Sequence, residues 1–547
     1  MVLDLLVHNA AVFDGVGYRP ELSAMGVANG RIVALGGDEL RDAATANTRI
    51  IDAEGGLLSP GFIDAHVHPI EGGLEHARCN LAGISTVDAL LVAIGNYAAA
   101  NPDEEWILGG GWQMSTFPGG APLASDLDRV VPDRPVYLPN RDHHGTWVNS
   151  VALARAGITR DTPDPADGRI ERDADGNPTG TLHEGASELV KRLIPADTDD
   201  SRYRALLDAQ RYLHSFGITG WQDAIVGNYG GHTDTSPIYQ RAAENGNLLS
   251  RVVAALWWDR NRGLEQLDEL RVSRALHTHP LFRATSIKIM QDGIPENHTA
   301  AMADPYRATG CRCAGDHRGI SFLDPYQLAE VVCALDADDW QVHIHAIGDR
   351  AVTESLDAIE RARKVNGPSD NRHHLAHIQI VNPLDIARFV SLDVTANIQT
   401  LWATNEPQMR ELNLPALGEK RYGWQYPFGD LASAGAFLAS GSDWPVSTPD
   451  PWKAIHVAVN RVLDSQDPDF NPVPLHIEHA MSLESALAAY TSGSARVNHD
   501  DDAGSLSVGR RADFAIANRN PFDNEMVSVS TTANRLTYIG GVEVFAR

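Results

Sequence analysis

The middle of the chain alternates short apolar runs with longer amphipathic stretches. Eight of the runs have the length and composition of buried strands, and helical patterns lie between several of them. Asp324 precedes the helical pattern at 325–337 and Asp349 the one at 350–363, each at the N-cap position. Repeated strand–helix units predict a parallel sheet, and eight units fit a (β/α)₈ TIM barrel, with a doubly wound open sheet as the alternative. The candidate strands are residues 62–66, 218–223, 251–257, 286–290, 341–345, 374–378, 393–398 and 436–442.

The two ends of the chain follow another pattern, in which β-like runs alternate with glycine turns. Such runs occupy 5–12, 24–27, 31–35 and 49–51, and similar runs fill 505–547. Two β segments at opposite ends of a chain can pair with each other. We therefore expect residues 1–58 and 500–547 to form one small β-sandwich domain.

Roughly 150 residues separate the first two candidate strands, which is too long for an ordinary loop. This interval is rich in Gly, Pro and Asp and contains its own strand-like and helical pieces, for example around GGGWQMSTFPGGAP. We expect residues 80–199 to form an inserted subdomain that shapes a pocket. Residues 59–79 and 200–499 would then form the metal-binding barrel.

Length, charge and cysteine content narrow the class of partner. The 547 residues exceed what one hydrophobic core usually supports, and the net charge is −27 with no run of Lys or Arg. So acidic a chain should repel a phosphate backbone, which disfavours nucleic acid. Four cysteines, among them the nearby Cys311 and Cys313, do not make a disulfide framework.

No apolar stretch approaches the ~18 residues of a membrane span, and the first residues are typical of a strand and not of a signal peptide. These features predict a cytoplasmic protein that acts on a small molecule, with neither a nucleic-acid nor a membrane partner. A homodimer is the commonest assembly for such an enzyme.

The strongest chemical signal is PGFIDAHVHP, in which His66 and His68 end an apolar strand. Side chains two apart on a strand point the same way, so both imidazoles can reach one cation. Alone, the motif is weak, and a pair of surface histidines after a strand is the more common explanation. The ends of the later strands add further groups, and in a barrel the C-terminal strand ends converge on one mouth. Those groups are Lys288, His343, His345, His377 and Asp443. Imidazole and carboxylate ligands suit Zn²⁺, Fe²⁺, Mn²⁺ or Co²⁺.

PGFIDAHVH, KIMQDG, HAIGD and GSDWP together resemble the amidohydrolase superfamily, and in particular the amidohydrolase-3 branch that includes N-substituted formamide deformylases. Matches of the same kind extend along nearly the whole chain, from RDHHGTWVNSVAL at 141–153 to GSLSVGRRADFAI at 504–516. The resemblance implies a metal-dependent hydrolase that cleaves a non-peptide carbon–nitrogen bond of a small amide or formamide.

The resemblance also implies a binuclear metal centre with two divalent ions, with zinc expected and iron, manganese or cobalt as alternatives. His66, His68 and Asp443 would bind the more buried ion, and His345 and His377 the second. Lys288 would bridge both ions as a carbamate, a carboxylysine. A hydroxide between the ions would be the nucleophile, with Asp443 as general base and then acid.

Matching motifs imply four further pocket residues, which are Trp112, His144, Asp292 and Trp444. His343 points to the same side as His345 but one layer deeper, so we expect it in the barrel interior. Two positions depart from the family pattern. Ala376 stands where relatives often have Glu, and His374 where an Arg is usual. These departures concern the surroundings of the second ion and not its ligands.

Other functions stay open at this point. One is a mononuclear deaminase of the same superfamily, against which Lys288 speaks because that chemistry needs no carbamate. Others are amidohydrolases acting on cyclic amides, N-acyl amino acids or carbamates. A non-catalytic barrel scaffold is the last, although such proteins usually lose metal ligands and here the full set is present.

Overall fold

The computed structural model describes residues 2–229, 232–307, 316–523 and 526–547. Cys311 and Cys313 lie outside these residues. All eight candidate strands are present and form a nearly closed parallel barrel, which confirms the predicted fold class. In sheet order from one edge, the strands are β21 (Leu438–Ser440), β20 (Thr395–Ile398), β19 (His374–His377), β18 (Gln341–Ala346), β17 (Phe282–Met290), β15 (Arg251–Trp257), β14 (Ile218–Val226) and β7 (Phe62–Val67).

The last strand returns to the first through backbone hydrogen bonds just beyond β21. The N–H of Asp443 donates to the carbonyl of His66 (2.7 Å), and the N–H of His68 donates to the carbonyl of Trp444 (2.9 Å). Gly441, two residues before Asp443, lies so close to β7 that an added Cβ would sit 2.5 Å from the backbone nitrogen of His66. The closure therefore brings Asp443 beside the two histidines that end β7.

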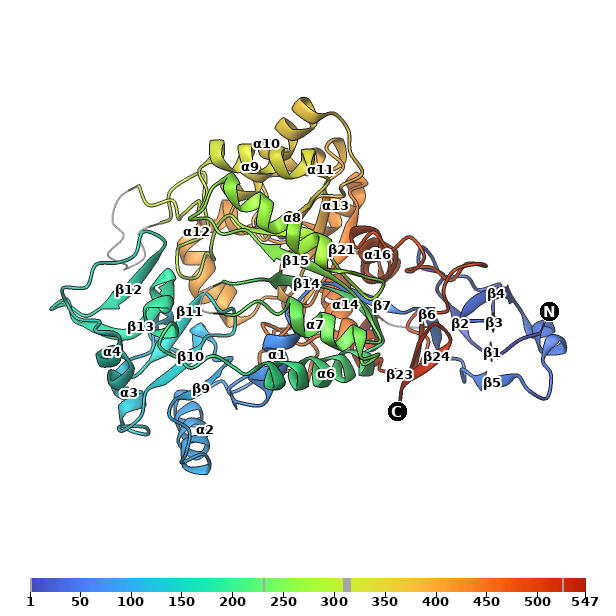
Figure 1. The fold of residues 1–547 in the computed structure, drawn as a ribbon, viewed down its shortest axis with the longest axis horizontal. Helices are drawn as coiled ribbons and strands as arrows, with labels where there is room; N and C mark the ends of the chain where they lie inside the picture. The colour runs from blue at the N-terminus through green and yellow to red at the C-terminus, as the bar shows by residue number, and fades with distance from the viewer. Residues whose placement is uncertain (1, 230–231, 308–315, 524–525) are drawn as a thin grey trace.

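Helices cover the outside of the barrel (Figure 1). Asp324 caps α9 (Pro325–Ala337), where its side chain accepts from the N–H groups of Tyr326 and Gln327. The expectation for Asp349 was wrong, because α10 (Asp349–Asn366) begins at Asp349 itself and Gly348 is its N-cap. The carboxylate of Asp349 instead accepts from the N–H of Ala303, in the loop that follows β17. The other covering helices are α1 (Pro69–His76), α6 (Asp199–Ser215), α7 (Ser236–Glu244), α8 (Leu267–Leu276), α11 (Ile386–Ser391), α13 (Phe428–Ala434) and α14 (Pro451–Asn460).

Strands from both ends of the chain pack together at one side of the barrel, where the two termini also lie (Figure 1). One sheet has four strands, in the order β4 (Arg31–Gly36), β3 (Ala24–Ala28), β1 (Leu5–His8) and β5 (Arg49–Asp52). The other has five, in the order β2 (Ala11–Val12), β6 (Leu57–Pro60), β22 (Phe514–Ala517), β23 (Asn534–Ile539) and β24 (Val542–Ala546). Apolar side chains of both sheets share one core, including Val7, Leu58 and Phe514.

The segment between α1 and α6 forms a sheet of its own at the opposite side of the barrel from the termini (Figure 1). Its strands are β12 (Gly168–Arg172), β13 (Pro178–Glu184), β11 (Gly145–Val148), β10 (Val136–Pro139), β9 (Ile107–Gly110) and β8 (Cys79–Asn80). Helices α2 (Val87–Ala100), α3 (Ala124–Asp128), α4 (Ser150–Ala156) and α5 (Glu188–Lys191) accompany it. Its core is shared with barrel loops, since Trp112 and Leu138 pack in one cluster with Ile294 and Ile347. We call residues 80–199 the insert.

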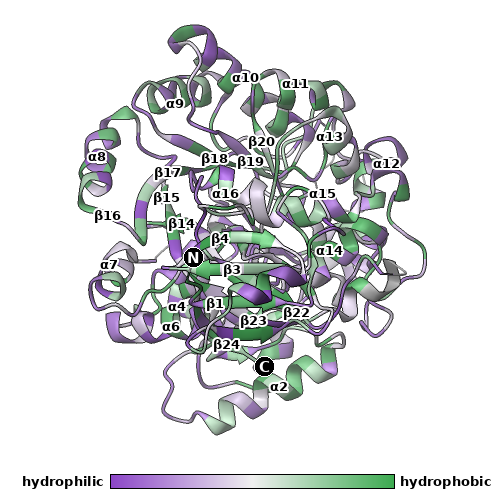
Figure 2. Ribbon diagram, turned by 90° about the vertical axis from the view of Figure 1, so that its right-hand side faces the viewer, coloured by the Kyte–Doolittle hydropathy of each residue, from purple (hydrophilic) through white to green (hydrophobic). Residues whose placement is uncertain are grey.

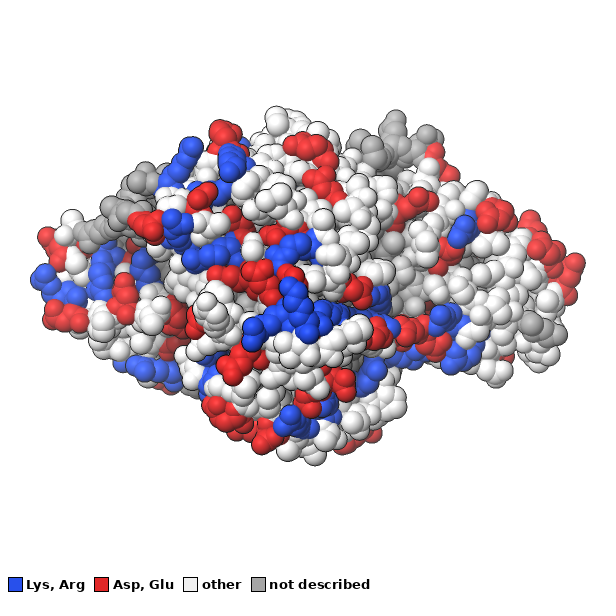
Figure 3. Space-filling view, turned by 90° about the horizontal axis from the view of Figure 1, so that it is seen from above, with Lys and Arg blue, Asp and Glu red and all other residues white. Residues whose placement is uncertain are grey.

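Apolar residues concentrate in the strands and on the inner sides of the helices (Figure 2). On the face in Figure 3, acidic and basic side chains are interspersed. None of the described helices is both long and apolar enough to cross a membrane.

Candidate metal centre

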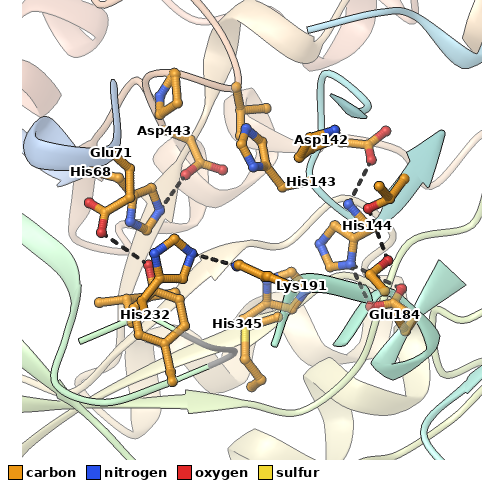
Figure 4. A pocket seen from close by; sticks show the side chains of 18 of the residues that line it. His68, Glu71, Asp142, His143, His144, Glu184, Lys191, His232, His345 and Asp443 are labelled. Carbon is orange, nitrogen blue, oxygen red and sulfur yellow. Dashed lines mark hydrogen bonds and ion pairs between the residues drawn. The ribbon is translucent and has the colours of Figure 1, made fainter. Parts of the chain in front are cut away.

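The C-terminal ends of the barrel strands meet at a cavity of ≈ 600 Å³, whose other wall is the insert (Figure 4). The register between neighbouring strands decides which side chains meet at the cavity, because paired residues of parallel strands lie side by side at the same height in the barrel. Lys288 on β17 pairs with His343 on β18, and Ala346 pairs with His377. All six predicted metal ligands line the cavity, namely His66, His68, Lys288, His345, His377 and Asp443.

Three of these side chains form a compact cluster of ligand atoms. Asp443 Oδ1 lies 3.2 Å from His66 Nε2 and 3.0 Å from His68 Nε2. All three ligand atoms lie within 4.8 Å of one another. Burial, followed by the charge of Lys288, lowers the pKa of His66 to about 3. Burial opposes ionisation of Asp443, but His66 and the hydrogen bonds from both histidines outweigh it and hold its pKa well below the usual range.

His343 lies below this cluster, as its place on β18 predicts. Its Nε2 is 2.8 Å from Nδ1 of His66, so the two rings share a hydrogen bond. The ring of His343 also packs against His374, with centroids 4.1 Å apart. His374 in turn accepts from the side-chain amide of Asn397, whose other N–H bonds the carbonyl of Ala65. This chain of contacts fixes the ring of His66 with Nε2 toward Asp443.

His345 and His377 form a second pair beside the first cluster. Their ring centroids lie 4.5 Å apart, and His377 Nδ1 is 3.9 Å from Asp443 Oδ2. His345 Nε2 and His377 Nδ1 are both buried, and neither has a hydrogen-bond partner among the described residues. Burial holds the pKa of both imidazoles well below the usual range, so they are neutral. Buried ring nitrogens with free lone pairs fit a divalent cation.

Lys288 lines the same cavity, beside His343 in the register of β17 and β18, and is only 1% exposed. Its ammonium forms no hydrogen bond or ion pair with any described residue, which is costly for a buried charge. Burial lowers the pKa of Lys288 to about 7. A large share of the side chain is therefore an uncharged amine at neutral pH.

Several residues at the cavity have strained backbone conformations. His377 has φ 75° and Asp443 has φ 56°, and the insert residues His143 and Glu184 have φ 64° and 51°. Non-glycine residues with positive φ are uncommon and persist where the surroundings over-determine them. Strained residues thus occur on both walls of the cavity.

Of the four further pocket residues predicted, only His144 lines the cavity among the described side chains. Its Nδ1 is 3.0 Å from both carboxylate oxygens of Glu184 (Figure 4). Glu184 also accepts from Thr299 Oγ1 (2.7 Å) and Asn297 Nδ2 (3.2 Å), both in the loop after β17. Burial lowers the pKa of His144, but the charge of Glu184 and its hydrogen bond outweigh this and raise it to about 9.

The other three of these residues lie behind the cavity wall. Trp112 is in the core of the insert, where its indole N–H donates to the carbonyl of Leu138 (2.8 Å). Asp292 accepts from three backbone N–H groups, those of Ala301, Ile347 and Gly348, and so ties the loop after β17 to the end of β18. Trp444 packs against Gly72, where an added Cβ would lie 2.7 Å from the indole.

Other cavity residues were not found from the sequence. They lie in helix α1, in the insert or in barrel loops, where no strand period marks them. Glu184 lies two residues after the end of the motif GRIERDADGNPTGTL, so the residues next to that motif were an available signal. The missed residues include Glu71, Arg141, Glu184, Lys191, Tyr229, His232, Glu296 and Glu406.

Comparison with known proteins agrees with this geometry. The model of the amidohydrolase family matches residues 49–545. The chain belongs to the amidohydrolase family. Among curated amidohydrolase-like relatives, the protein LONG AFTER FAR-RED 3 of Arabidopsis thaliana is 31% identical over 100% of this chain and 92% of its own length. The N-substituted formamide deformylase of Arthrobacter pascens is 27% identical over 100% of this chain and 98% of its own.

A solved structure of similar fold is that of an uncharacterized metal-dependent hydrolase from Pyrococcus furiosus. It has a TM-score of 0.69 and 26% sequence identity, and the match covers 95% of this chain and 100% of that one. This amidohydrolase is therefore a metal-dependent hydrolase that acts on carbon–nitrogen bonds, which confirms the family and the enzyme class expected from the sequence.

Proposed function

We propose that this amidohydrolase hydrolyses a small, non-peptide amide of the formamide type with two divalent metal ions, zinc being the expected metal. The observation that carries the proposal is a pair of buried ring nitrogens, on His345 and His377, that have no hydrogen-bond partner among the described residues. They lie beside the compact cluster of His66, His68 and Asp443. The second pair would have no use in a site for one ion held by the compact cluster alone.

The chain's own residues divide the work of holding the ions. His66, His68 and Asp443 would hold one, and His345 and His377 the other. Bound there, divalent ions would polarise the amide carbonyl and lower the pKa of a water molecule to about 7. His343 would keep the ring of His66 in the orientation that this requires.

Lys288 would link the two groups after reaction with CO₂. Its uncharged Nζ would form a bond to the carbon of CO₂ and release one proton, which gives a carbamate with two oxygen ligands. The burial of Lys288 and its lack of any ion-pair partner among the described residues support this role.

Asp443 and His144 would handle the reacting groups. Asp443 would take the proton from the attacking water and pass it to the amide nitrogen as the carbon–nitrogen bond breaks, which releases an acid and an amine. Because His144 Nδ1 is bound to Glu184, Nε2 is the atom left to face the substrate. A donor at that position would stabilise the oxygen that becomes negative during attack.

Metal analysis and native mass spectrometry test the proposal. The protein is reconstituted with zinc and bicarbonate, dialysed, and assayed for metal and for hydrolysis of formamides, N-acyl amines, cyclic amides and carbamates. We expect two ions per chain, and a mass at Lys288 that is higher by one CO₂. A protein that binds no transition metal after this treatment contradicts the proposal.

The Lys288→Ala variant separates the two kinds of metal centre. If it kept full activity and metal content, a mononuclear enzyme of the deaminase type would replace the binuclear one.

A further inference from the structure

The arginines along the active-site cavity are already bound to carboxylates of the chain itself. Among the described residues four arginines line it, and each forms an ion pair. Arg141 binds Glu406 through two contacts, of 2.8 and 3.3 Å. The remaining pairs are Arg78 with Asp197 (2.6 Å), Arg202 with Asp199 (3.0 Å) and Arg260 with Asp167. Arg141 is held at both ends of its fork, whereas each of the other three has one contact with its acid. For every one of these arginines, the carboxylate of a ligand would therefore compete with an acid of the chain.

The two lysines that line the cavity among the described residues are not free cations either. Lys288 belongs to the metal centre. Lys191 forms no ion pair with a described carboxylate, but its Nζ lies 2.5 Å from Nε2 of His232, and burial lowers its pKa although Glu188, Glu71 and Glu75 oppose this. The two insert histidines that line the cavity are also bound to acids. His143 Nε2 is 3.3 Å from Glu75, and His144 is bound to Glu184.

Carboxylates, by contrast, are in excess. Outside the metal cluster, ten Asp or Glu and five Lys or Arg among the described residues line the cavity. Glu296 is 9% exposed and forms no ion pair with any described residue. Its Oε1 accepts from the neutral amide of Asn413 (2.9 Å), and burial raises the pKa of Glu296 to about 7. One carboxylate oxygen of Glu71, Oε2, is buried and has no hydrogen-bond partner among the described residues.

From these pairings we propose that the cavity accepts amides of uncharged or ammonium-bearing amines and rejects amides whose leaving group carries a carboxylate. This inference rests on the proposed amide hydrolysis and narrows its substrate class from N-acyl compounds in general to N-acyl amines. A substrate carboxylate would have to displace an internal acid from an arginine or lie unpaired among like charges. Like charges placed together across an interface are strongly unfavourable.

Three formamides of one chain length test the inference. Each has the formamide nitrogen at one end of a four-carbon chain, and the other end carries a methyl, an ammonium or a carboxylate group. With the metal-loaded protein, we expect kcat/KM for the carboxylate to be on the order of 100-fold below that of the methyl compound. The ammonium compound should equal or exceed the methyl compound. A carboxylate compound that is turned over as well as the methyl one overturns the inference.

Binding of the three free amines, measured by calorimetry, gives a second readout that needs no turnover. The same order of affinity is expected, with the amino acid weakest. If none of the three formamides is hydrolysed but the amines bind in this order, the proposed reaction fails and the charge selection stands. If the amino acid binds best, the charge selection fails whatever the reaction.

Releasing an arginine should weaken the preference for the methyl compound over the carboxylate compound. Glu406→Gln leaves Arg141 without its carboxylate, so kcat/KM for the carboxylate formamide should rise about 10-fold relative to the methyl compound. Asp167→Asn does the same for Arg260 and serves if the first variant does not fold. The matched control is Glu105→Gln, which frees Arg155 on the exposed side of the insert, 2.7 Å from Glu105 in the unaltered chain. The control should leave the ratio unchanged. An unchanged ratio in both cavity variants overturns the assignment.

Discussion

Both the barrel wall and the insert wall of the cavity carry buried histidines, but the surroundings of these histidines shift their pKa values in opposite directions. On the barrel wall, His66 and His68 share one carboxylate, that of Asp443. The free ring nitrogens of His345 and His377 lie 3.7 Å from Asp292 and 3.9 Å from Asp443, too far for hydrogen bonds. Burial lowers the pKa of His66, His345 and His377. On the insert wall, His143 and His144 each have a carboxylate of their own, and the pKa of both is raised above the usual value. Unsatisfied ring nitrogens suit a metal ion, whereas satisfied ones suit contacts with a substrate.

The contrast between the two walls is tested first on the barrel wall, where a substitution of Asp443 should have the largest effect on activity and metal content. Asp443→Asn removes the negative charge that His66 and His68 share and the group that would carry the proton. We expect kcat to fall by about 10²–10⁴ and metal to be lost on dialysis, as measured by elemental analysis. Asp268→Asn, at an 89% exposed side chain on α8, is the control and should change neither quantity. Unchanged activity in Asp443→Asn would favour a scaffold.

The insert wall is tested next, at His144 and its partner. His144→Ala should lower kcat by about 10²-fold with metal content unchanged, because it removes a donor near the reacting carbonyl and no ligand. Glu184→Gln should have a smaller effect of the same kind, because the imidazole keeps a neutral partner. Steady-state kinetics and elemental analysis on the same samples distinguish the two walls. Loss of metal from His144→Ala would place His144 with the barrel group.

A smaller effect is expected at His343, which touches His66 and no substrate. His343→Gln should weaken metal affinity by about 10–100-fold, measured by competition with a chelator, while kcat of the fully loaded enzyme changes less. His373→Gln is the control, because His373 lies outside the barrel mouth and is bound to Asp336 (2.9 Å). It should affect stability but not metal affinity. Equal metal affinity in His343→Gln and the unaltered chain would contradict the role of His343.

The smallest expected effect concerns the stability of the insert. Burial raises the pKa of Glu171, but the hydrogen bond from His183 and the charge of Arg169 outweigh it and lower the pKa to about 2. A lowered carboxyl pKa stabilises the fold above the unfolded value of about 4.3 and ceases to do so as the pH falls toward 2. Glu171→Gln should therefore cost up to about 3 kcal/mol at pH 7 and progressively less below pH 4. Thermal unfolding at several pH values measures this, and a pH-independent difference would contradict it.

The sequence was sufficient to predict the barrel and to bring the candidate ligands to one cavity, because both follow a strict period. Strands such as 251–257 were placed to the residue, and every ligand candidate stands at or just beyond a strand end. The cavity wall made by the insert was not predictable in this way. Trp112 and Trp444 lie in conspicuous motifs but pack as core, since their large rings fill space beside glycines and strands. Residues such as Glu296 and Glu406 reach the cavity only through loop geometry, which no local pattern encodes.

The closure of β21 on β7 places His68 and Asp443 in contact although 375 positions separate them along the chain. A ribosome that adds about 5–20 residues per second needs on the order of 20–75 s to make the second of these residues after the first. Throughout that interval the emerging polypeptide holds an exposed His-X-His pair without its carboxylate. The compact cluster cannot form during synthesis before the last strand appears, so an ion that needs all three of these ligands would be bound only by a nearly finished polypeptide. Metal binding at this cluster would then belong to the final step of maturation.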